Sequence, residues 1–187
     1  MAGETLAKIV RNLVPSEPPQ KGLRFASVSI ILRDRQLPEV LLIKRADRKG
    51  DPWSGQIAFP GGKMQVGDRT ARDTAIRETM EEVGIDLSRA AEFLGYGDVT
   101  TTHTGTMDVV PCVFKLKESV EVSPNSEVAS FRWVELDELS KPTSRSTFDL
   151  ARNGRAMAMP AFVVGDYVVW GLTYRILKTI LEDGGHL

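Results

Sequence analysis

The sequence has a single cysteine, Cys112, among its 187 residues, so no disulfide can form within the chain. One isolated thiol in an apolar stretch is typical of a protein from a reducing compartment, and we expect it to be a buried structural group. The chain also lacks a long apolar run, and its first residues, MAGETLAKIVRNLV, have no signal-peptide pattern. We therefore expect a cytoplasmic protein with no membrane partner.

An excess of charge of either sign is absent as well. The 24 Lys and Arg residues face 25 Asp and Glu residues, which gives a net charge of −1. This balance argues against non-specific binding to nucleic acid or to an anionic membrane. It is compatible with a small phosphorylated ligand that is held by a local cluster of basic groups. A chain of this length is expected to form one domain with a sizeable core.

Hydrophobic patterning predicts a layered α/β or α+β domain, because strands are interspersed with helices. Residues 1–20 are expected to form an amphipathic helix, centred on 4–14, and a Pro-rich linker, and 21–187 the main domain. Strands are predicted at 24–34, 40–45, 56–59, 92–99, 108–116 and 128–134, with further short runs at AFVVG and YVVW. Helices are predicted at 70–83, 136–139 and 171–183, and Gly84 is expected to end the first of these. No regular structure is expected at 60–68 or assigned at 141–159.

The predicted helix over 70–83 carries three carboxylates in the segment RETMEEVGI. At about 100° per residue, Glu82 lies about 40° to one side of Glu78 and Glu81 about 60° to the other, so the three share a face. We expect a different stripe of the helix to be buried, made of Ile76, Thr79, Met80 and Val83.

These like charges repel one another, and they lie near the end of the helix where its dipole also disfavours them. A glycine-rich loop, PGGK, precedes the helix and allows a backbone to approach a ligand closely. Clustered oxygen ligands suit a hard divalent cation such as Mg²⁺, with coordination sites left for water and phosphate. A solvated charged face is the ordinary explanation of such a helix, and a metal site is the alternative that the glycine loop favours.

The stretch GGKMQVGDRTARDTAIRETMEEVGI resembles the Nudix box. That box has a Gly, five residues, a Glu, seven residues and then R-E-U-x-E-E-x-G-U, where U is apolar. Gly62 begins the match here, and the required positions of the final segment are filled by Arg77, Glu78, Glu81, Glu82, Gly84 and Ile85. Asp68 replaces the first Glu, eight residues separate it from Arg77, and Thr79 replaces an apolar residue. The first two departures are also seen in the coenzyme A diphosphatase branch.

Further segments resemble that branch, namely SGQIAFPGG, TGTMDVVPCV and VVWGLT, and SEVASFRWVELDEL is similar to a strand of many Nudix hydrolases. The resemblance therefore runs from about residue 24 to 182. One loop departs from the branch, because it is one residue longer and places Gly50 where an Arg is expected. Arg48 and Lys49 are candidates to replace that Arg. The departure concerns specificity for coenzyme A and not the hydrolase assignment.

The resemblance implies a Nudix fold, an α/β/α sandwich with a central mixed β-sheet in which the box forms a loop–helix–loop. It also implies hydrolysis of a nucleoside diphosphate linked to another group, with Mg²⁺ or Mn²⁺ as cofactor. The first substrate prediction is coenzyme A or a derivative, cleaved to 3′,5′-ADP and a 4′-phosphopantetheine product. The alternatives are ADP-ribose, a dinucleotide or a nucleoside triphosphate as substrate, or a non-catalytic nucleotide sensor.

The family's metal ligands, carried onto this sequence, are Glu78 and Glu82 in the inner sphere, Asp68 in the outer sphere and the carbonyl of Gly62. Glu81 is predicted to be a third ligand or a base that holds water. Arg77 is expected to pair with a carboxylate and hold the acidic face in place, with a free surface arginine as the alternative.

The catalytic base is a box glutamate in some members of the family and a glutamate from a later loop in others. Glu127 is the candidate of the second kind, and an ordinary surface acid is its alternative. Substrate contacts are predicted from Arg45, Gln56, Phe59 and Gly61, although Gln56 is equally well explained as a polar residue at a strand end. Trp133 and Trp170 are expected in the core. The oligomeric state is open, and a homodimer formed through the N-terminal helix is one arrangement.

Overall fold

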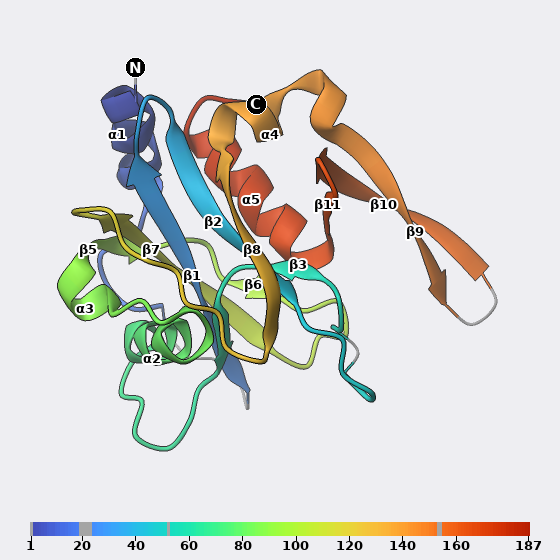
Figure 1. Cartoon of the computed structure of the whole chain (residues 1–187), viewed down its shortest axis with the longest axis horizontal. Coiled ribbons are helices and arrows are strands. Elements are labelled where there is room, and N and C mark those ends of the chain that lie inside the picture. The colour runs from blue at the N-terminus through green and yellow to red at the C-terminus, as the bar shows by residue number, and fades with distance from the viewer. Residues whose placement is uncertain (1, 19–23, 52, 153–154) are drawn as a thin grey trace.

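The chain forms a central mixed β-sheet with helices on both faces and a smaller sheet at one side (Figure 1). The computed structural model describes residues 2–18, 24–51, 53–152 and 155–187. The helices are α1 (Ala2–Asn12), α2 (Ala71–Val83), α3 (Leu87–Ala90), α4 (Leu136–Ser140), the 3-10 helix η1 (Pro142–Ser144) and α5 (Gly171–Asp183). The strands are β1 (Phe25–Asp34), β2 (Pro38–Arg45), β3 (Ile57–Ala58), β4 (Gly61–Lys63), β5 (Ala91–Tyr96), β6 (Thr100–Thr101), β7 (Asp108–Leu116), β8 (Val128–Glu135), β9 (Arg145–Arg152), β10 (Arg155–Val164) and β11 (Tyr167–Trp170).

The main sheet has the strand order β3-β2-β1-β7-β5, and β4, β6 and β8 pair with β1, β7 and β2. β1 and β7 run parallel, from the pair Phe25–Asp108 to the pair Leu32–Lys115, whereas the neighbouring pairings are antiparallel. Both strands are nearly continuous apolar runs, as expected where a sheet is covered on both faces. The predicted central mixed sheet is confirmed.

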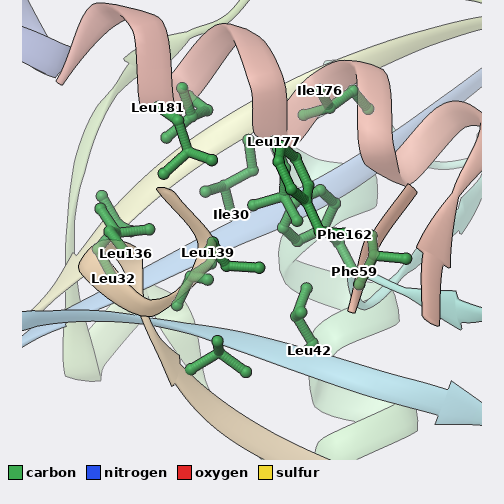
Figure 2. Close-up of a cluster of buried hydrophobic side chains, with 14 of the residues drawn as sticks. Ile30, Leu32, Leu42, Phe59, Leu136, Leu139, Phe162, Ile176, Leu177 and Leu181 are labelled. Atoms are coloured by element: carbon green, nitrogen blue, oxygen red, sulfur yellow. The ribbon is translucent and has the colours of Figure 1, made fainter. Parts of the chain in front are cut away.

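The two faces of the main sheet are covered by different helices. Successive residues of a strand point to opposite faces, so Leu41 and Leu42 belong to different core clusters. Leu42 and Ile30 lie on the side of α5, with Leu177, Leu181 and Phe162 packed above them (Figure 2). On the other side, Leu41, Ile31 and Ile43 pack with residues of α2 and α3: Ala75, Val83 and Leu87. The predicted α/β/α sandwich is therefore confirmed.

The N-terminal helix α1 packs on the body of the protein. Ile9 is fully buried in the same cluster as α5. The side-chain amide of Asn12 donates to the carboxylate of Asp183 at 2.8 Å, and Val14 pairs with Tyr96 of β5. The predicted N-terminal helix is confirmed, and it begins two residues earlier than expected. The predicted Pro-rich linker falls partly on residues 19–22, which lie outside the described residues.

Two stretches that sequence patterning left irregular contain strands. Residues 61–63 form β4, which pairs with β1, so the expectation of no regular structure at 60–68 is wrong. The unassigned stretch 141–159 contains η1, β9 and the first half of β10. β9 and β10 make a long antiparallel hairpin that projects from the body and is drawn in orange in Figure 1. Within the part of the chain that the structure describes, no helix is long and apolar enough to cross a membrane.

Candidate active site

Helix α2 begins and ends where its capping residues predict. Thr70 accepts a hydrogen bond from the backbone N–H of Asp73 at 3.0 Å, which satisfies one of the free donors at the start of the helix. Gly84 follows the helix with a φ of 71°, a left-handed conformation that favours glycine. The predicted helix over 70–83 is therefore confirmed within one residue. Small side chains, Ala71 and Ala75, face the core and let the helix lie close to the sheet.

Glu82 is buried at the end of α2, with an exposed fraction of 3%. One of its carboxylate oxygens accepts a hydrogen bond from the backbone N–H of Gly61 at 2.9 Å. Arg45 lies 3.9 Å from the other oxygen. Burial raises the pKa of Glu82 to about 7, although the Gly61 hydrogen bond and the charge of Arg45 oppose the shift. The site therefore holds a carboxylate whose negative charge is incompletely compensated.

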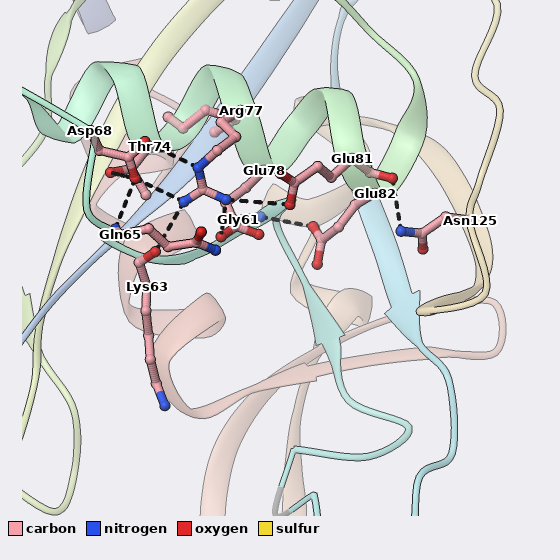
Figure 3. A network of polar contacts seen from close by, with 12 residues as sticks. Gly61, Lys63, Gln65, Asp68, Thr74, Arg77, Glu78, Glu81, Glu82 and Asn125 are labelled. Carbon is pink, nitrogen blue, oxygen red and sulfur yellow. Dashed lines mark hydrogen bonds and ion pairs between the residues drawn. The ribbon is translucent and has the colours of Figure 1, made fainter.

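Glu78 lies one helical turn earlier and faces the same glycine-rich loop. A Cβ at position 62 would lie 2.5 Å from the Glu78 carboxylate, so that a side chain there would displace the carboxylate. Burial raises the pKa of Glu78, and its ion pair with Arg77 at 2.8 Å partly offsets that effect. Gly61 and Gly62 thus bring the loop backbone against two carboxylates of α2 (Figure 3).

The expected orientation of α2 is wrong in two respects. Met80, which was expected in the buried stripe, is 53% exposed, whereas Glu82 is buried. Glu81 points to solvent with a side chain that is 53% exposed. The helix is therefore rotated about its axis, so that the three acids occupy a buried, a half-buried and an exposed position. Thr79 and Val83 lie in the buried stripe as expected.

Arg77 connects the glycine-rich loop to the acidic helix (Figure 3). Its guanidinium donates to both oxygens of Asp68, at 3.1 and 2.8 Å, and to the carbonyl of Lys63 at 3.1 Å. It also lies 2.8 Å from Glu78 and 3.3 Å from Glu81. Hydrogen bonds from Arg77 lower the pKa of Asp68 to about 2, against the effect of burial. A forked, two-bond contact of this kind fixes orientation as well as distance.

The loop that precedes β8 covers the end of α2. The backbone N–H of Asn125 donates to the carbonyl of Glu82, and its side-chain amide donates to the carbonyl of Glu81, at 2.9 and 2.8 Å. These carbonyls would otherwise lack partners at the helix terminus. Glu127 follows on this loop, forms an ion pair with Arg48 at 3.1 Å, and contributes its charge to the raised pKa of Glu82. Glu127 therefore lies near the box carboxylates in space, although it is far from them in sequence.

A cleft of about 960 Å³ opens beside the glycine-rich loop. The four predicted substrate residues, Arg45, Gln56, Phe59 and Gly61, all line it. Phe59 is 3% exposed and belongs mainly to the core, whereas Arg45 has an Nε atom that is buried without a hydrogen-bond partner. A guanidinium that lines a cleft brings positive charge to it, which favours an anionic ligand.

Several cleft residues were not predicted as site residues. Trp170 was expected in the core, but it is half-buried and lines the cleft. Trp133, which does not line the cleft, is half-buried and packs against the core cluster beneath α2, as expected, and Arg33 stacks on its ring at 4.1 Å. The hairpin contributes Leu150, Met157 and Met159 to the cleft wall. Met157 and Met159 are two residues apart, which is the spacing of side chains on one face of a strand. This spacing was the signal available in the sequence.

The donor chemistry of the site fits a divalent cation. Among the described residues, no three His, Cys, Asp or Glu side chains form a closed metal-binding group. The arrangement is open instead, with Glu82 against Gly61 and Glu78 against Gly62. A cation beside Glu82 would supply positive charge where a buried carboxylate lacks it. Carboxylate and carbonyl oxygens are the ligands that Mg²⁺ and Mn²⁺ prefer, with the remaining positions taken by water and phosphate.

A mixed sheet sandwiched by helices, with an acidic helix behind a glycine loop, defines a class of nucleotide-cleaving domain. The NUDIX domain family matches residues 23–152, and the chain belongs to this family. It is a Nudix hydrolase that acts on a nucleoside diphosphate linked to another group, and such hydrolases generally use divalent metal ions.

Among similar proteins, the Nudix hydrolase NudL of Pectobacterium atrosepticum is 32% identical over 170 residues, which cover 90% of this chain and 86% of that protein. NudL of Yersinia enterocolitica is 28% identical and covers 97% of this chain and 94% of its own length. An uncharacterized protein of Schizosaccharomyces pombe is 31% identical over 79% of this chain, and the chain spans 51% of that relative.

Solved structures show the same fold at low identity. A MutT/nudix family protein from Enterococcus faecalis has a TM-score of 0.57 at 19% identity, covering 98% of this chain and 70% of that one. An Ap4A hydrolase of C. elegans, solved as a binary complex, has a TM-score of 0.50 at 23% identity, covering 60% of this chain and 80% of that one. The predicted Nudix fold is therefore confirmed.

Proposed function

We propose that the protein hydrolyses the diphosphate bond of coenzyme A or a derivative, and that it releases 3′,5′-ADP and a 4′-phosphopantetheine product. The observation that carries this proposal is that three segments of the sequence meet at one cleft. Three segments that are far apart in sequence resemble the coenzyme A diphosphatase branch, and all three line the cleft beside the box. They contribute, for example, Gln56, Met107 and Thr173.

In this proposal, Glu78, Glu82 and the carbonyl of Gly62 hold Mg²⁺ or Mn²⁺, with Glu81 as a third ligand or a base. Asp68 would remain in the outer sphere, and the hydrogen bonds that its oxygens accept from Arg77, Gln65 and Thr74 support this assignment. A bound cation neutralises phosphate oxygens and lowers the pKa of water.

The chain's own residues set the geometry of this reaction. Arg77 holds the glycine loop against the helix. Arg45 lies between Asp51 and Glu82 and presents its guanidinium to the cleft for a phosphate oxygen. Glu127 and Glu82 are the two candidates for the group that takes a proton from the attacking water. Glu127 is the better placed for release of that proton to solvent, since its side chain is 43% exposed.

A second candidate function is the same hydrolysis on ADP-ribose, a dinucleotide or a nucleoside triphosphate. The loop after β2 favours it, because Gly50 occupies the position of an expected Arg. Arg48, the first candidate to replace that Arg, is engaged with Glu127 at 3.1 Å.

The test is a turnover screen of the purified protein with coenzyme A, ADP-ribose, NADH, diadenosine polyphosphates and nucleoside triphosphates, each with Mg²⁺ and with Mn²⁺. Release of 3′,5′-ADP from coenzyme A supports the proposal, and turnover confined to another substrate supports the second candidate. The Glu82→Gln variant is the control, and it should lose nearly all turnover while it stays folded. If the wild-type protein turns over none of these substrates, and the Glu82→Gln variant keeps the same response to a nucleotide ligand, the protein is instead a nucleotide sensor.

The remaining expectations are separate proposals. The boundary at residue 20, a homodimer through α1 and a cytoplasmic location each stay predictions. The solution mass of the purified chain tests the dimer, and cell fractionation tests the location.

A further inference from the structure

Strand β9 forms an open edge of the second sheet. The strand order in this sheet is β11-β10-β9, so within the part of the chain that the structure describes β9 pairs with β10 on one side and with no strand on the other. Figure 1 shows the β9–β10 hairpin projecting from the body of the protein. An edge strand presents backbone N–H and C=O groups that can pair with a strand of another molecule.

The backbone of β9 directs alternate residues to this open edge. Thr147 lies opposite Pro160 of β10. Because proline has no N–H, this pair is expected to be one whose backbone groups point away from each other. Thr147 then directs its N–H and C=O to the open edge, and residues two positions away, Arg145 and Asp149, do the same. All three residues are exposed to solvent, so the edge is accessible to a partner.

Two opposite charges lie symmetrically about Thr147 on this edge. Arg145 and Asp149 project from the same face of the strand because they are an even number of residues apart. Across the hairpin they lie opposite Phe162 and Ala158, which cannot neutralise them, and among the described residues neither has an ion-pair partner. Charges on an edge strand commonly prevent pairing between molecules. Opposite charges at symmetric positions instead become partners when the strand meets its own copy.

We propose that β9 is a self-association surface, which pairs antiparallel with β9 of a second copy of the chain about a two-fold axis at Thr147. A two-fold axis makes the interface self-complementary, so that each contact occurs twice. With the axis at Thr147, Arg145 of each copy faces Asp149 of the other. An axis at Asp149 would place like charges opposite each other, which is destabilising. The complementary charges therefore select a second copy of the chain as the partner and select the register of pairing.

This pairing would join the second sheets of two copies into one continuous sheet. A two-fold axis perpendicular to the sheet keeps each face of the sheet on its own side, so the same face of both hairpins points in one direction. Leu150 and Met157 form a pair on the hairpin, and both line the cleft. The two clefts would therefore open on the same side of the dimer, with the interface next to one wall of each.

The experiment measures the solution mass of the full chain by analytical ultracentrifugation over a concentration series. The wild-type chain should change from monomer to dimer in the micromolar range, because an edge-to-edge interface buries little surface. Arg145→Asp and Asp149→Arg each place like charges opposite each other at both contacts, and each should weaken the dimer by about tenfold or more. An equimolar mixture of these two variants restores opposite charges at both contacts and should associate with about the affinity of the wild type.

Two further variants separate pairing at the edge from a general effect of charge. Glu121→Arg makes the same charge change as Asp149→Arg at an exposed position outside the hairpin, and it should leave association unchanged. Thr147→Pro removes the N–H at the centre of the interface without any change of charge, and it should abolish the dimer. Circular dichroism and thermal unfolding establish that each variant is folded.

Restored association in the mixture of the two charge variants supports the proposal. A wild-type chain that stays monomeric over the whole series overturns it, as does a dimer that survives both charge reversals. A dimer that is lost in Val10→Ser, at an exposed position of α1, and kept in the hairpin variants also overturns it, because α1 would then form the interface. The mass is measured without substrate, so the result does not depend on the proposed hydrolysis.

Discussion

The hydroxyl of Thr79 donates a hydrogen bond of 2.7 Å to the hydroxyl of Ser29, and both residues are fully buried between α2 and β1. Ser29 in turn donates to the backbone carbonyl of Ala75 at 3.1 Å. The Nudix box has an apolar residue at the position of Thr79. Its replacement by a hydroxyl is accommodated here because a partner on the sheet satisfies it.

This pair should contribute to stability as a unit. Thr79→Val and Ser29→Ala are each expected to lower the free energy of unfolding by about 1–2 kcal/mol, because each change leaves a buried polar group with fewer partners. The double variant should cost less than the sum of the single changes, with a coupling of about 1 kcal/mol. Urea denaturation of the four proteins measures this cycle, and additive effects would show that the two hydroxyls act independently.

Gly62 is expected to be essential for activity without being essential for folding. A Cβ at this position meets the Glu78 carboxylate, which is the end of a flexible side chain, so Gly62→Ala should move Glu78 and leave the backbone intact. We expect turnover to fall by at least about a hundredfold, in line with the loss of a well-placed electrostatic group. Thermal unfolding should show little change.

The matched control for this change is Gly67→Ala in the same loop. Nothing lies within 4 Å of a Cβ there, but the φ of +110° disfavours any side chain. We expect a loss of stability of about 1 kcal/mol with turnover retained. If Gly62→Ala kept full activity, the proposed role of Glu78 as a ligand would be wrong.

Arg77→Lys should separate charge from geometry. Lysine keeps the positive charge, but it cannot make the forked contact with Asp68 and also reach the carbonyl of Lys63. We expect a loss of about 1–3 kcal/mol in stability and at least a tenfold loss in kcat. Arg69→Lys is the control, since Arg69 is 88% exposed in its ion pair with Asp73 and should change stability by less than about 0.5 kcal/mol. Equal effects of the two substitutions would contradict a positioning role for Arg77.

Cys112 should be an unreactive thiol in the native protein. Burial raises its pKa from 9.0 to about 12, although a hydrogen bond with Ser27 opposes the shift. A thiol reagent at pH 8 should therefore react after unfolding and not before, because the thiolate is the nucleophile. The raised pKa also makes stability fall above pH 9, where the unfolded thiol ionises and the native thiol does not.

Comparison with Cys112→Val isolates this contribution of Cys112 from that of other titrating groups. Between pH 8 and pH 10, the wild-type protein should lose about 1 kcal/mol more stability than the variant. Below pH 8, the difference in stability between the two proteins should not change with pH. Rapid modification of the native thiol at pH 8 would show that the β7 strand opens readily.

The limits of α2 were predictable because Thr70 and Gly84 mark them locally. The rotation of α2 about its own axis was not predictable. A helical wheel shows how the three acids lie relative to one another, and it does not show how they lie relative to the sheet. The small residues Ala71 and Ala75 determine which side approaches β1, and that choice buries Glu82 and exposes Met80. Thr79 was placed correctly in the buried stripe, but its hydrogen-bond partner Ser29 lies 50 residues away and could not be identified from the sequence.

The hairpin was missed because its apolar residues alternate with small and polar ones and are not fully buried. Phe148 and Leu150 in one segment, and Met157 and Met159 in the next, have the period of two that is typical of strands. The dipeptide Asn-Gly lies between these segments in the sequence and is a common signal of a tight hairpin. Sequence reasoning that weighed these two signals together would have predicted the hairpin, but not its position beside the cleft.

Helix α2 rests on β1, β4 and β7 of the main sheet, whereas the β9–β10 hairpin belongs to the second sheet, which packs against α5. Helix α2 and the hairpin wall of the cleft are thus supported by separate sheets. Substitutions along the hairpin can accumulate without disturbing the supports of Glu78 and Glu82.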